Sequence, residues 1–351
     1  MKPIKTALCS FGMSGWVFHA PFIQAHPGFE LYAVLERTKT LAVQSYSQVI
    51  TFRNLEELLA DENIELVVVN VPNVLHYDYA LQCLNAGKHV IVEKPFTITL
   101  AQASELIKLA EQNKLLLSVF QNRRWDSDFL TVQRIVKSGM LGEIKEVEIH
   151  YDRYNEAPSP KAHKEVPEKG TGIIYDLGSH LIDQALQLFG MPEAVFADTV
   201  IQRPVSLVDD YMEILLIYPG LRVRLKGSTL IKEAVPAFTV HGSKGSFLKV
   251  RGDVQEADLQ QHKVPLSSGW GIEATEHKGL LHTEVNGEVL KQLEETEAGD
   301  YMLYYEAMFQ ALRHDKPLPV TASEGANVIQ VIEAAYKSVR SRSIIDIKNS
   351  W

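Results

Sequence analysis

The chain has 351 residues, of which 46% are hydrophobic and 23% charged, and this length and composition predict a globular protein with two domains. A formal net charge of −9 argues against nucleic acid or an anionic membrane as the main partner, because both reward clustered lysine and arginine. Only two cysteines are present, and no apolar stretch is long enough for a signal peptide or a membrane span. We therefore expect a cytoplasmic protein without disulfides.

The chain begins with a strand, a glycine turn and a helix. An apolar run over residues 4–9 ends at a turn over residues 10–15, and a helical pattern follows. This order is the context in which a G-x-G-x-x-G turn binds the pyrophosphate of a dinucleotide, although Ser10 stands where the first glycine is expected. The candidate cofactor-binding residues of this turn are Ser10, Phe11, Gly12, Met13, Ser14 and Gly15.

The next expected strand, over residues 30–35, ends at two charged residues of opposite sign. Glu36 is placed to accept hydrogen bonds from the adenosine ribose of NAD. Arg37, followed by Thr38 and Lys39, could instead grip the 2′-phosphate of NADP. A solvated charged turn is the third interpretation, and the sequence leaves all three open.

Strand and helix patterns alternate over roughly the first 120 residues, which predicts a doubly wound parallel sheet. Ligands bind such sheets at the carboxyl ends of the strands. We therefore expect cofactor contacts from residues that follow two strands, with helix capping as the rival role for Asn73. These candidates are Pro72, Asn73, His76, Glu93 and Lys94. Lys94 is also a candidate to polarise a substrate oxygen, against the alternative of an exposed lysine in a turn.

The rest of the chain has a different pattern. Several strand candidates with few intervening helices follow residue 143, and two amphipathic helices lie over residues 301–314 and 323–342. This predicts an α+β domain with a large, mostly antiparallel sheet. We place a dinucleotide-binding Rossmann domain at residues 1–121 and a domain for substrate binding and oligomerisation at 122–351, whose C-terminal helix packs back on the first domain. Residues 254–297 are polar and of no predicted shape.

A helical pattern over residues 170–187 carries Asp176 and His180 beside an apolar stripe. Residues four apart are neighbours on one helix face, and a carboxylate beside an imidazole suits a general base. A buried structural pair is the alternative. The spacing also suits two metal ligands, but no third ligand stands at a supporting spacing, so we expect no metal. Asp183 and Gln184 share this face as supporting or substrate contacts.

Four motifs together resemble the Gfo/Idh/MocA oxidoreductase family, and most closely its NADP-dependent scyllo-inositol dehydrogenase branch. They are HAPF at 19–22, EKP at 93–95, QNRRWDSDFLT at 121–131 and G-x-x-x-D-x-x-x-H at 172–180. The resemblance implies hydride transfer between a nicotinamide cofactor and a secondary hydroxyl of a sugar or cyclitol. It implies Lys94, Asp176 and His180 as the catalytic group, favours NADP over NAD, and implies a homodimer or homotetramer.

Other residues are candidates for binding the substrate. Asn122, Arg123, Trp125, Arg153 and Tyr154 include types that bind polyols by hydrogen bonds and ring stacking, with structural roles as the alternative. Two other functions remain open. One is a cofactor-binding sensor on the same fold, and the other is an aldose dehydrogenase or a reductase of another carbonyl compound.

Overall fold

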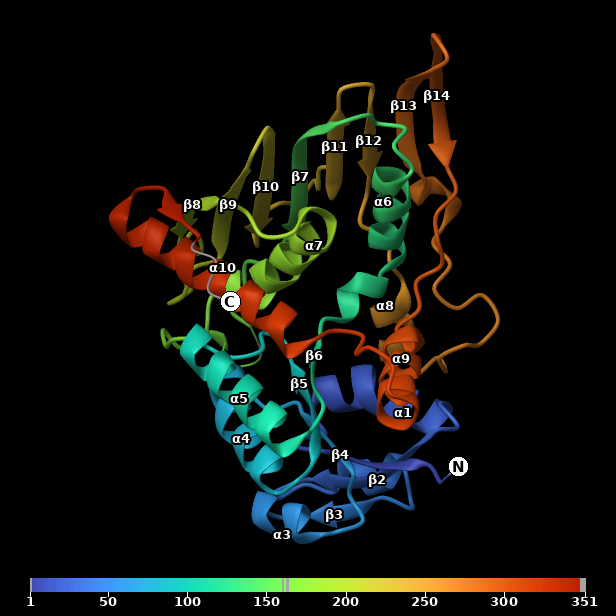
Figure 1. Ribbon diagram of the computed structural model, residues 1–351, viewed down its shortest axis with the longest axis vertical. Coiled ribbons are helices and arrows are strands. Elements are labelled where there is room, and N and C mark those ends of the chain that lie inside the picture. Colours follow the sequence, from blue (N-terminus) through green and yellow to red (C-terminus); the bar gives the residue numbers. More distant parts are fainter. Residues whose placement is uncertain (1, 160, 162–163, 348–351) are drawn as a thin grey trace. The chain divides into compact units, whose positions relative to one another are not determined.

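The computed structural model describes residues 2–159, 161 and 164–347, shown in Figure 1. The described residues form two compact units that alternate along the chain. The first unit is built from residues up to 122, together with 254–270 and 300–326. The second is built from residues 123–253, 271–299 and 327 onward. No helix in these described ranges is both long and apolar enough to cross a membrane.

The first unit contains a six-stranded sheet in the order β3-β2-β1-β4-β5-β6, with every pair parallel. The strands are β1 (Ile4–Leu8), β2 (Phe29–Leu35), β3 (Ile50–Phe52), β4 (Leu66–Val69), β5 (His89–Glu93) and β6 (Leu117–Phe120). The central strand β4 is buried along its whole length, as its run of Leu and Val predicts for a sheet covered on both faces. The predicted doubly wound parallel sheet is confirmed, and its strand order reverses between β1 and β4.

The first unit has helices between its strands, most of them as the alternation predicted, and two more that come from later in the chain. They are α1 (Ala20–Ala25), α2 (Leu41–Ser45), α3 (Leu55–Ala60), α4 (His76–Asn85), α5 (Leu100–Asn113), α8 (Gln255–Gln260) and α9 (Met302–His314). Asn54 caps α3, because its side chain accepts a hydrogen bond from the Glu57 amide at 2.8 Å. Helices α4 and α5 lie side by side (Figure 1).

The second unit contains a nine-stranded sheet in the order β14-β13-β12-β11-β7-β10-β9-β8-β15. The strands are β7 (Ile144–Asp152), β8 (Ala194–Val200), β9 (Tyr211–Tyr218), β10 (Leu221–Ser228), β11 (Phe238–Gly242), β12 (Gly245–Lys249), β13 (Gly279–Val285), β14 (Glu288–Glu294) and β15 (Ile345–Asp346). Within this order β7 and β10 pair in parallel, and the other neighbours pair antiparallel. The predicted large, mostly antiparallel sheet is confirmed.

One helical segment carries the apolar stripe that packs on this sheet. It begins as a π-helix, η5 (Ile174–Gly178), and continues as α7 (Ser179–Phe189). Helix α7 lies against β7 and β10 and beside α6 (Ser127–Lys137). Its buried residues include the apolar positions Leu181 and Ala185 of the predicted stripe, and also the polar residues His180, Asp183 and Gln184.

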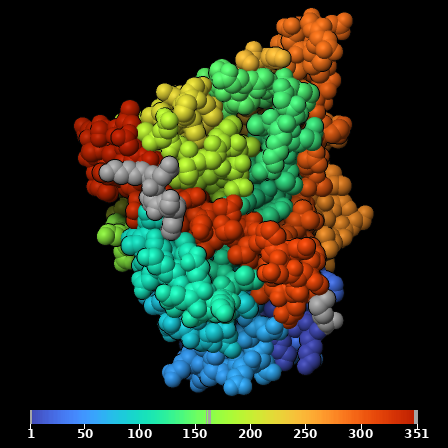
Figure 2. All heavy atoms as spheres, viewed as in Figure 1, coloured from blue at the N-terminus to red at the C-terminus, as the bar shows by residue number. Residues whose placement is uncertain are grey.

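The segment of no predicted shape folds partly into the hairpin β13–β14, drawn in orange in Figure 2. Its strand β14 exposes apolar side chains, with Val289 at 73% and Leu293 at 62% exposure. The remaining helix, α10 (Ala322–Ser341), contributes residues to both units.

Candidate active site

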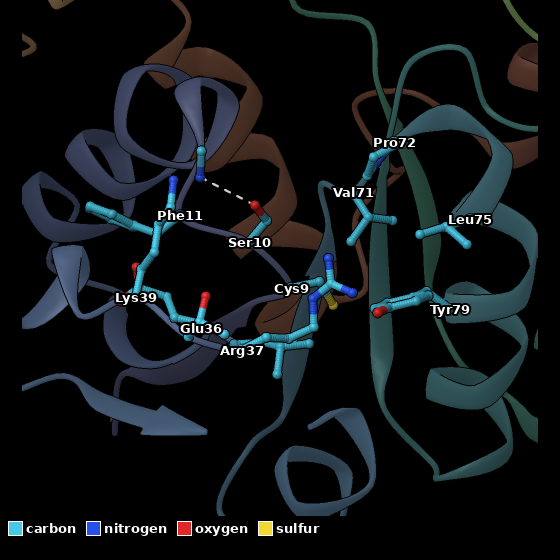
Figure 3. A pocket seen from close by; sticks show the side chains of 13 residues that line it. Cys9, Ser10, Phe11, Glu36, Arg37, Lys39, Val71, Pro72, Leu75 and Tyr79 are labelled. Atoms are coloured by element: carbon cyan, nitrogen blue, oxygen red, sulfur yellow. Dashed lines mark hydrogen bonds between the residues drawn. The ribbon is translucent and has the colours of Figure 1, made fainter. Parts of the chain in front are cut away.

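A pocket of about 250 Å³ lies in the first unit, next to the ends of β1, β2 and β4 (Figure 3). This is the place where strand order reverses, and ligands of doubly wound sheets bind there. Its lining residues are Cys9, Ser10, Phe11, Gly12, Leu35, Glu36, Arg37, Thr38, Lys39, Val71, Pro72, Leu75 and Tyr79. Six of the residues predicted to bind cofactor therefore line one pocket, namely Ser10, Phe11, Gly12, Glu36, Arg37 and Pro72.

The glycine turn keeps its shape although its first glycine is replaced. The Ser10 hydroxyl accepts a hydrogen bond from the Gly12 amide at 3.2 Å, and the Ser10 carbonyl accepts one from the Asn70 side chain at 2.8 Å. A Cβ at Gly15 would lie 2.4 Å from that same carbonyl oxygen. Gly15 is therefore required for the close approach of helix and turn, whereas a Cβ at Gly12 would make only an ordinary contact of 3.5 Å with the Ser10 hydroxyl.

Glu36 caps a helix. One carboxylate oxygen accepts a hydrogen bond from the Leu41 amide and the other from the Ala42 amide, both at 3.0 Å. Its side chain and backbone are buried to 6% exposure. Arg53 donates to the carbonyl oxygens of Glu36 and Lys39, at 2.7 and 2.6 Å. The loop between β2 and α2 is thus held at both ends. The Glu36 carboxylate, a candidate to bind the ribose, already binds two backbone amides in the first turn of α2.

Arg37 and Lys39 are exposed residues on the same loop, and both line the pocket. Figure 3 shows the Arg37 guanidinium directed into the pocket, on the side where Tyr79 lies. A guanidinium and an ammonium beside an open glycine turn suit a ligand with several phosphates. The pocket therefore fits a dinucleotide that carries an extra phosphate on its ribose.

Glu93, at the end of β5, accepts hydrogen bonds from three donors. These are the Ser14 hydroxyl, the His19 Nε2–H at 3.0 Å and the Lys94 amide at 3.1 Å. Burial acts to raise the pKa of Glu93, but the hydrogen bonds and charges of His19, Ser14 and Lys94 outweigh it and lower the pKa to about 2. The carboxylate is therefore ionised and fixed where the backbone turns into Lys94.

His76, predicted to bind cofactor, is fully buried. Its Nδ1 lies 2.8 Å from the Pro95 carbonyl oxygen and its Nε2 lies 2.9 Å from that of Val71. Burial lowers the pKa of His76, and the two carbonyl groups offset this only in part. The ring joins the loop after β4 to the loop that carries Lys94.

In the second unit, Asp176 lies on the π-helix η5 and His180 in the first turn of α7. The sequence predicted one uninterrupted helix, and the structure inserts a π-turn, a feature that is frequent at functional sites. His180 is 5% exposed. Half-buried Asp209 fixes the start of this segment, because its carboxylate accepts hydrogen bonds from the Ile173 amide at 3.2 Å and the Tyr336 hydroxyl at 3.3 Å.

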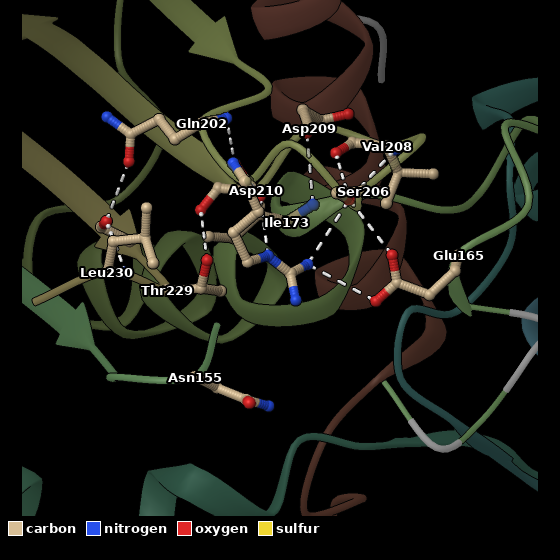
Figure 4. A network of polar contacts seen from close by, with 12 residues as sticks. Asn155, Glu165, Ile173, Gln202, Ser206, Val208, Asp209, Asp210, Thr229 and Leu230 are labelled. Carbon is tan, nitrogen blue, oxygen red and sulfur yellow. Dashed lines mark hydrogen bonds and ion pairs between the residues drawn. The ribbon is translucent and has the colours of Figure 1, made fainter. Parts of the chain in front are cut away.

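Asp176 pairs with Lys164, whose Nζ lies 2.7 Å from Oδ1. Lys164 belongs to the loop that follows β7, and a buried network around Arg203 holds this loop (Figure 4). Arg203 is paired with Asp210 at 2.8 Å and donates to the Ala157 carbonyl at 2.6 Å. The network thereby fixes one end of the loop whose lysine contacts Asp176.

The NRRW segment is bound to α7 one turn after His180. Arg124 and Asp183 form a buried ion pair with two hydrogen bonds, of 2.8 and 2.7 Å, and the Gln184 amide donates to the Arg123 carbonyl at 3.1 Å. Asp183 and Gln184 therefore hold neighbouring backbone and side chains in place, as the supporting role predicted.

The candidate substrate residues lie in varied surroundings. Arg123 pairs with Asp126 at 3.2 Å and lies over the Tyr151 ring, and Arg153 donates to the Tyr151 hydroxyl oxygen at 3.3 Å. Tyr154 is 42% exposed, and Lys232 lies over its ring. Asn122 is buried, at the end of the first unit, and Trp125 is half-buried, in the second.

Several residues of these sites were missed in the sequence. Tyr79 lies one turn after His76, a spacing that could have marked it as a lining residue. Lys164 lies in a proline-containing loop without periodicity, and Asp209 follows no motif. No local signal identifies these two, because their roles depend on contacts with residues distant in the sequence.

The strand order and the pocket define a dinucleotide-binding α/β protein, and comparison with known proteins gives its family. Residues 4–121 match the model of the NAD-binding Rossmann fold of the Gfo/Idh/MocA oxidoreductases, and residues 133–347 match that of their C-terminal alpha/beta domain. The chain belongs to the Gfo/Idh/MocA oxidoreductase family.

Several relatives are similar to the chain over nearly their full length. The chain is 42% identical to an uncharacterised oxidoreductase of Schizosaccharomyces pombe, over 99% of this chain and 100% of the relative. It is 36% identical to the NADP+-dependent scyllo-inositol 2-dehydrogenase of Bacillus subtilis, over 99% and 96%. A solved structure from Bacteroides fragilis, described as an oxidoreductase, is 46% identical with a TM-score of 0.90, over 98% and 100% of the chains. The chain is an NAD(P)-dependent dehydrogenase that acts on CH–OH groups of a small molecule.

Proposed function

We propose that this enzyme oxidises a secondary hydroxyl of a cyclitol or sugar resembling scyllo-inositol, with NADP+ as the preferred cofactor. The observation that carries the proposal is the similarity, over nearly the whole of both chains, to an NADP+-dependent scyllo-inositol 2-dehydrogenase. The pocket supports the cofactor preference, because Glu36 is bound to the amides of α2 while Arg37 and Lys39 line the open side.

The binding residues for the cofactor are those of the turn and of the loop after β2. Gly12 offers open backbone to a pyrophosphate, and Arg37 and Lys39 offer positive charge to a ribose phosphate. Glu93 and His76 act through the loop backbone on either side of Lys94. The nicotinamide ring, when bound, supplies the acceptor for a hydride.

Three residues perform the proton chemistry in this proposal. His180 accepts the proton of the substrate hydroxyl, a role for which an imidazole is suited near neutral pH. Lys94 donates a hydrogen bond to the same oxygen and stabilises its developing negative charge. Asp176 orients the substrate or His180, and its pairing with Lys164 holds the carboxylate in one position.

Two further assignments belong to the proposal. Residues 1–121 bind the cofactor, which is supported by the match of residues 4–121 to an NAD-binding model, and residues 122–351 bind the substrate through Asn122, Arg123, Trp125 or Tyr154. The chain works as a homodimer or homotetramer, which is supported by half-exposed apolar side chains at the edge of the large sheet, among them Phe196 and Val200. Light scattering after size-exclusion chromatography tests the oligomer directly.

The test of the catalytic proposal is nicotinamide absorbance with NADP+ and NAD+ offered separately against a panel of inositols and aldoses. We expect turnover with an inositol and a preference for NADP+. His180→Asn should lower turnover at least about a hundredfold and leave cofactor affinity unchanged. His282→Asn, at an exposed position on β13, is the matched control and should behave as wild type. Turnover of His180→Asn at the wild-type rate would exclude His180 as the base.

A further inference from the structure

A chain of hydrogen bonds passes through His19, the histidine of the HAPF motif, inside the first unit. His19 is fully buried at the end of the π-helix η1 (Gly15–His19). Its Nδ1 lies 2.7 Å from the Tyr305 hydroxyl oxygen, and its Nε2 lies 3.0 Å from Glu93 Oε1. The other oxygen of Glu93 accepts from the Lys94 amide. One carboxylate therefore connects the imidazole to the backbone of Lys94.

The hydrogen atoms in this series of hydrogen bonds can be counted, because each group has a known number of donors and acceptors. The Tyr305 hydroxyl donates to the Phe18 carbonyl oxygen at 3.0 Å, because a carbonyl can only accept. Burial, with the charges of Tyr304 and Glu93, raises the pKa of Tyr305 above its ordinary value, so the phenol keeps its single hydrogen. That hydrogen is used toward Phe18. The contact between Tyr305 and His19 at 2.7 Å can be a hydrogen bond beside this one only if Nδ1 carries the hydrogen.

The same count applies at the other ring nitrogen. Glu93, with its lowered pKa, is ionised and has no hydrogen to give. Its contact with His19 at 3.0 Å therefore uses a hydrogen on Nε2. An imidazole that donates from both nitrogens is an imidazolium. The buried anion of Glu93 lies in direct contact with this cation, which is what makes a buried charge tolerable.

We propose that His19 is a positioning residue, held as a buried imidazolium, that fixes the Glu93 carboxylate and through it the backbone that presents Lys94 to the substrate. The inference deepens the proposed function and rests on Lys94 acting there. The titratable groups in contact with the ring are Glu93 at the end of β5 and Tyr305 from α9, and the charge of Lys94 acts on Glu93. The remaining face of the ring packs on Phe120 of β6, with ring centroids 4.5 Å apart.

His26 offers an internal comparison in the same unit. Its Nδ1 accepts a hydrogen bond from the Gly28 amide at 2.9 Å, so that nitrogen carries no hydrogen. Its Nε2 lies 2.9 Å from Glu306, a carboxylate whose side chain is 50% exposed. Geometry thus assigns one ring hydrogen to His26 and two to His19, although each ring contacts a glutamate.

The experiment is nitrogen NMR of the full-length enzyme labelled with ¹⁵N-histidine, at pH 8, where a free imidazole with its pKa of about 6.5 is neutral. His19→Gln and His26→Gln assign the two rings. We expect both nitrogens of His19 to give protonated shifts and only one nitrogen of His26 to do so. Tyr305→Phe, which removes the acceptor for Nδ1–H, should return His19 to a single hydrogen. A neutral His19 in the wild-type enzyme at pH 8 overturns the proposal.

Kinetics tests the positioning role separately. In His19→Gln we expect kcat to fall about tenfold to hundredfold through misplacement of Lys94, with the Kd for NADP+ unchanged, while His26→Gln keeps the wild-type kcat. Wild-type kcat in His19→Gln refutes the role. If His19→Gln does not fold, the same kcat loss is sought in Tyr305→Phe. If the enzyme turns over no polyol but His19 is an imidazolium, the proposed function is contradicted, whereas the two hydrogens assigned to His19 are confirmed.

Discussion

Replacing Arg37 by alanine should separate the two cofactors. Arg37 is exposed on the loop between β2 and α2, and its guanidinium enters the pocket. A guanidinium grips a phosphate with two parallel hydrogen bonds. Only NADP+ carries a phosphate on the adenosine ribose, so the loss should fall on NADP+ and leave NAD+ binding as it was.

The size of the effect follows from the exposure of the site. A hydrogen bond to a charged group contributes about 1.5–3 kcal/mol, and an exposed pair falls at the low end because water and salt screen it. Two such bonds near the pocket rim should contribute about 2–3 kcal/mol in total. At about 1.4 kcal/mol per factor of ten, this corresponds to a loss of about 30- to 140-fold in NADP+ affinity.

The assay is calorimetric titration of both cofactors into wild type, Arg37→Ala and Lys108→Ala. Lys108 lies exposed on α5, so its replacement removes the same charge away from the pocket and should change neither Kd. Equal losses for NAD+ and NADP+ in Arg37→Ala would show that Arg37 supports the loop and reads no phosphate. An unchanged NADP+ affinity would contradict the assignment of this loop to the ribose.

Three further changes test other parts of the structure. Gly15→Ala brings a methyl group to within 2.4 Å of the Ser10 carbonyl oxygen, so we expect a loss of about 1–3 kcal/mol in unfolding free energy and weaker cofactor binding by titration; wild-type values for both would contradict the close approach. Arg124→Ala leaves the Asp183 carboxylate buried without its cation, which should cost about 3–5 kcal/mol in urea unfolding, and the loss should be smaller when Asp183 is also replaced by alanine; an equal or larger loss in the double variant speaks against the pair. Glu93 has a folded pKa of about 2, below its ordinary 4.5, so the stability that its ionised carboxylate contributes is present above about pH 4.5 and disappears as the pH falls toward 2. The unfolding free energy should therefore decline less steeply over that range in Glu93→Gln than in wild type. An identical decline in both would contradict a lowered pKa for Glu93.

The sequence predicted most of the first sheet because parallel strands buried on both faces are continuous apolar runs. Residues 66–69 of β4 illustrate this, since every one of them is buried. Strand β3 and helix α2 escaped prediction because each is short and only partly buried. The hairpin β13–β14 escaped for a related reason. Most of β14 is exposed, so it has no apolar face to generate a period of two.

The candidate site was predictable where a local pattern carries the chemistry. The glycine turn and the spacing of Asp176 and His180 are such patterns, and the structure places the first at the pocket and the second on one helical segment. Partners distant in the sequence were not predictable. Arg124 and Asp183 are 59 residues apart, and only the folded chain brings their side chains together.

The position of Glu36 has a consequence for altering cofactor choice in this enzyme. Its carboxylate binds the first amides of α2, and its carbonyl group is held by Arg53. The Glu36 side chain therefore lies in the pocket that selects the cofactor and also stabilises the fold of this loop. Redesign toward NAD+ must supply a second acid for the ribose and leave Glu36 in place, since a library varied at this position would select first for an intact loop.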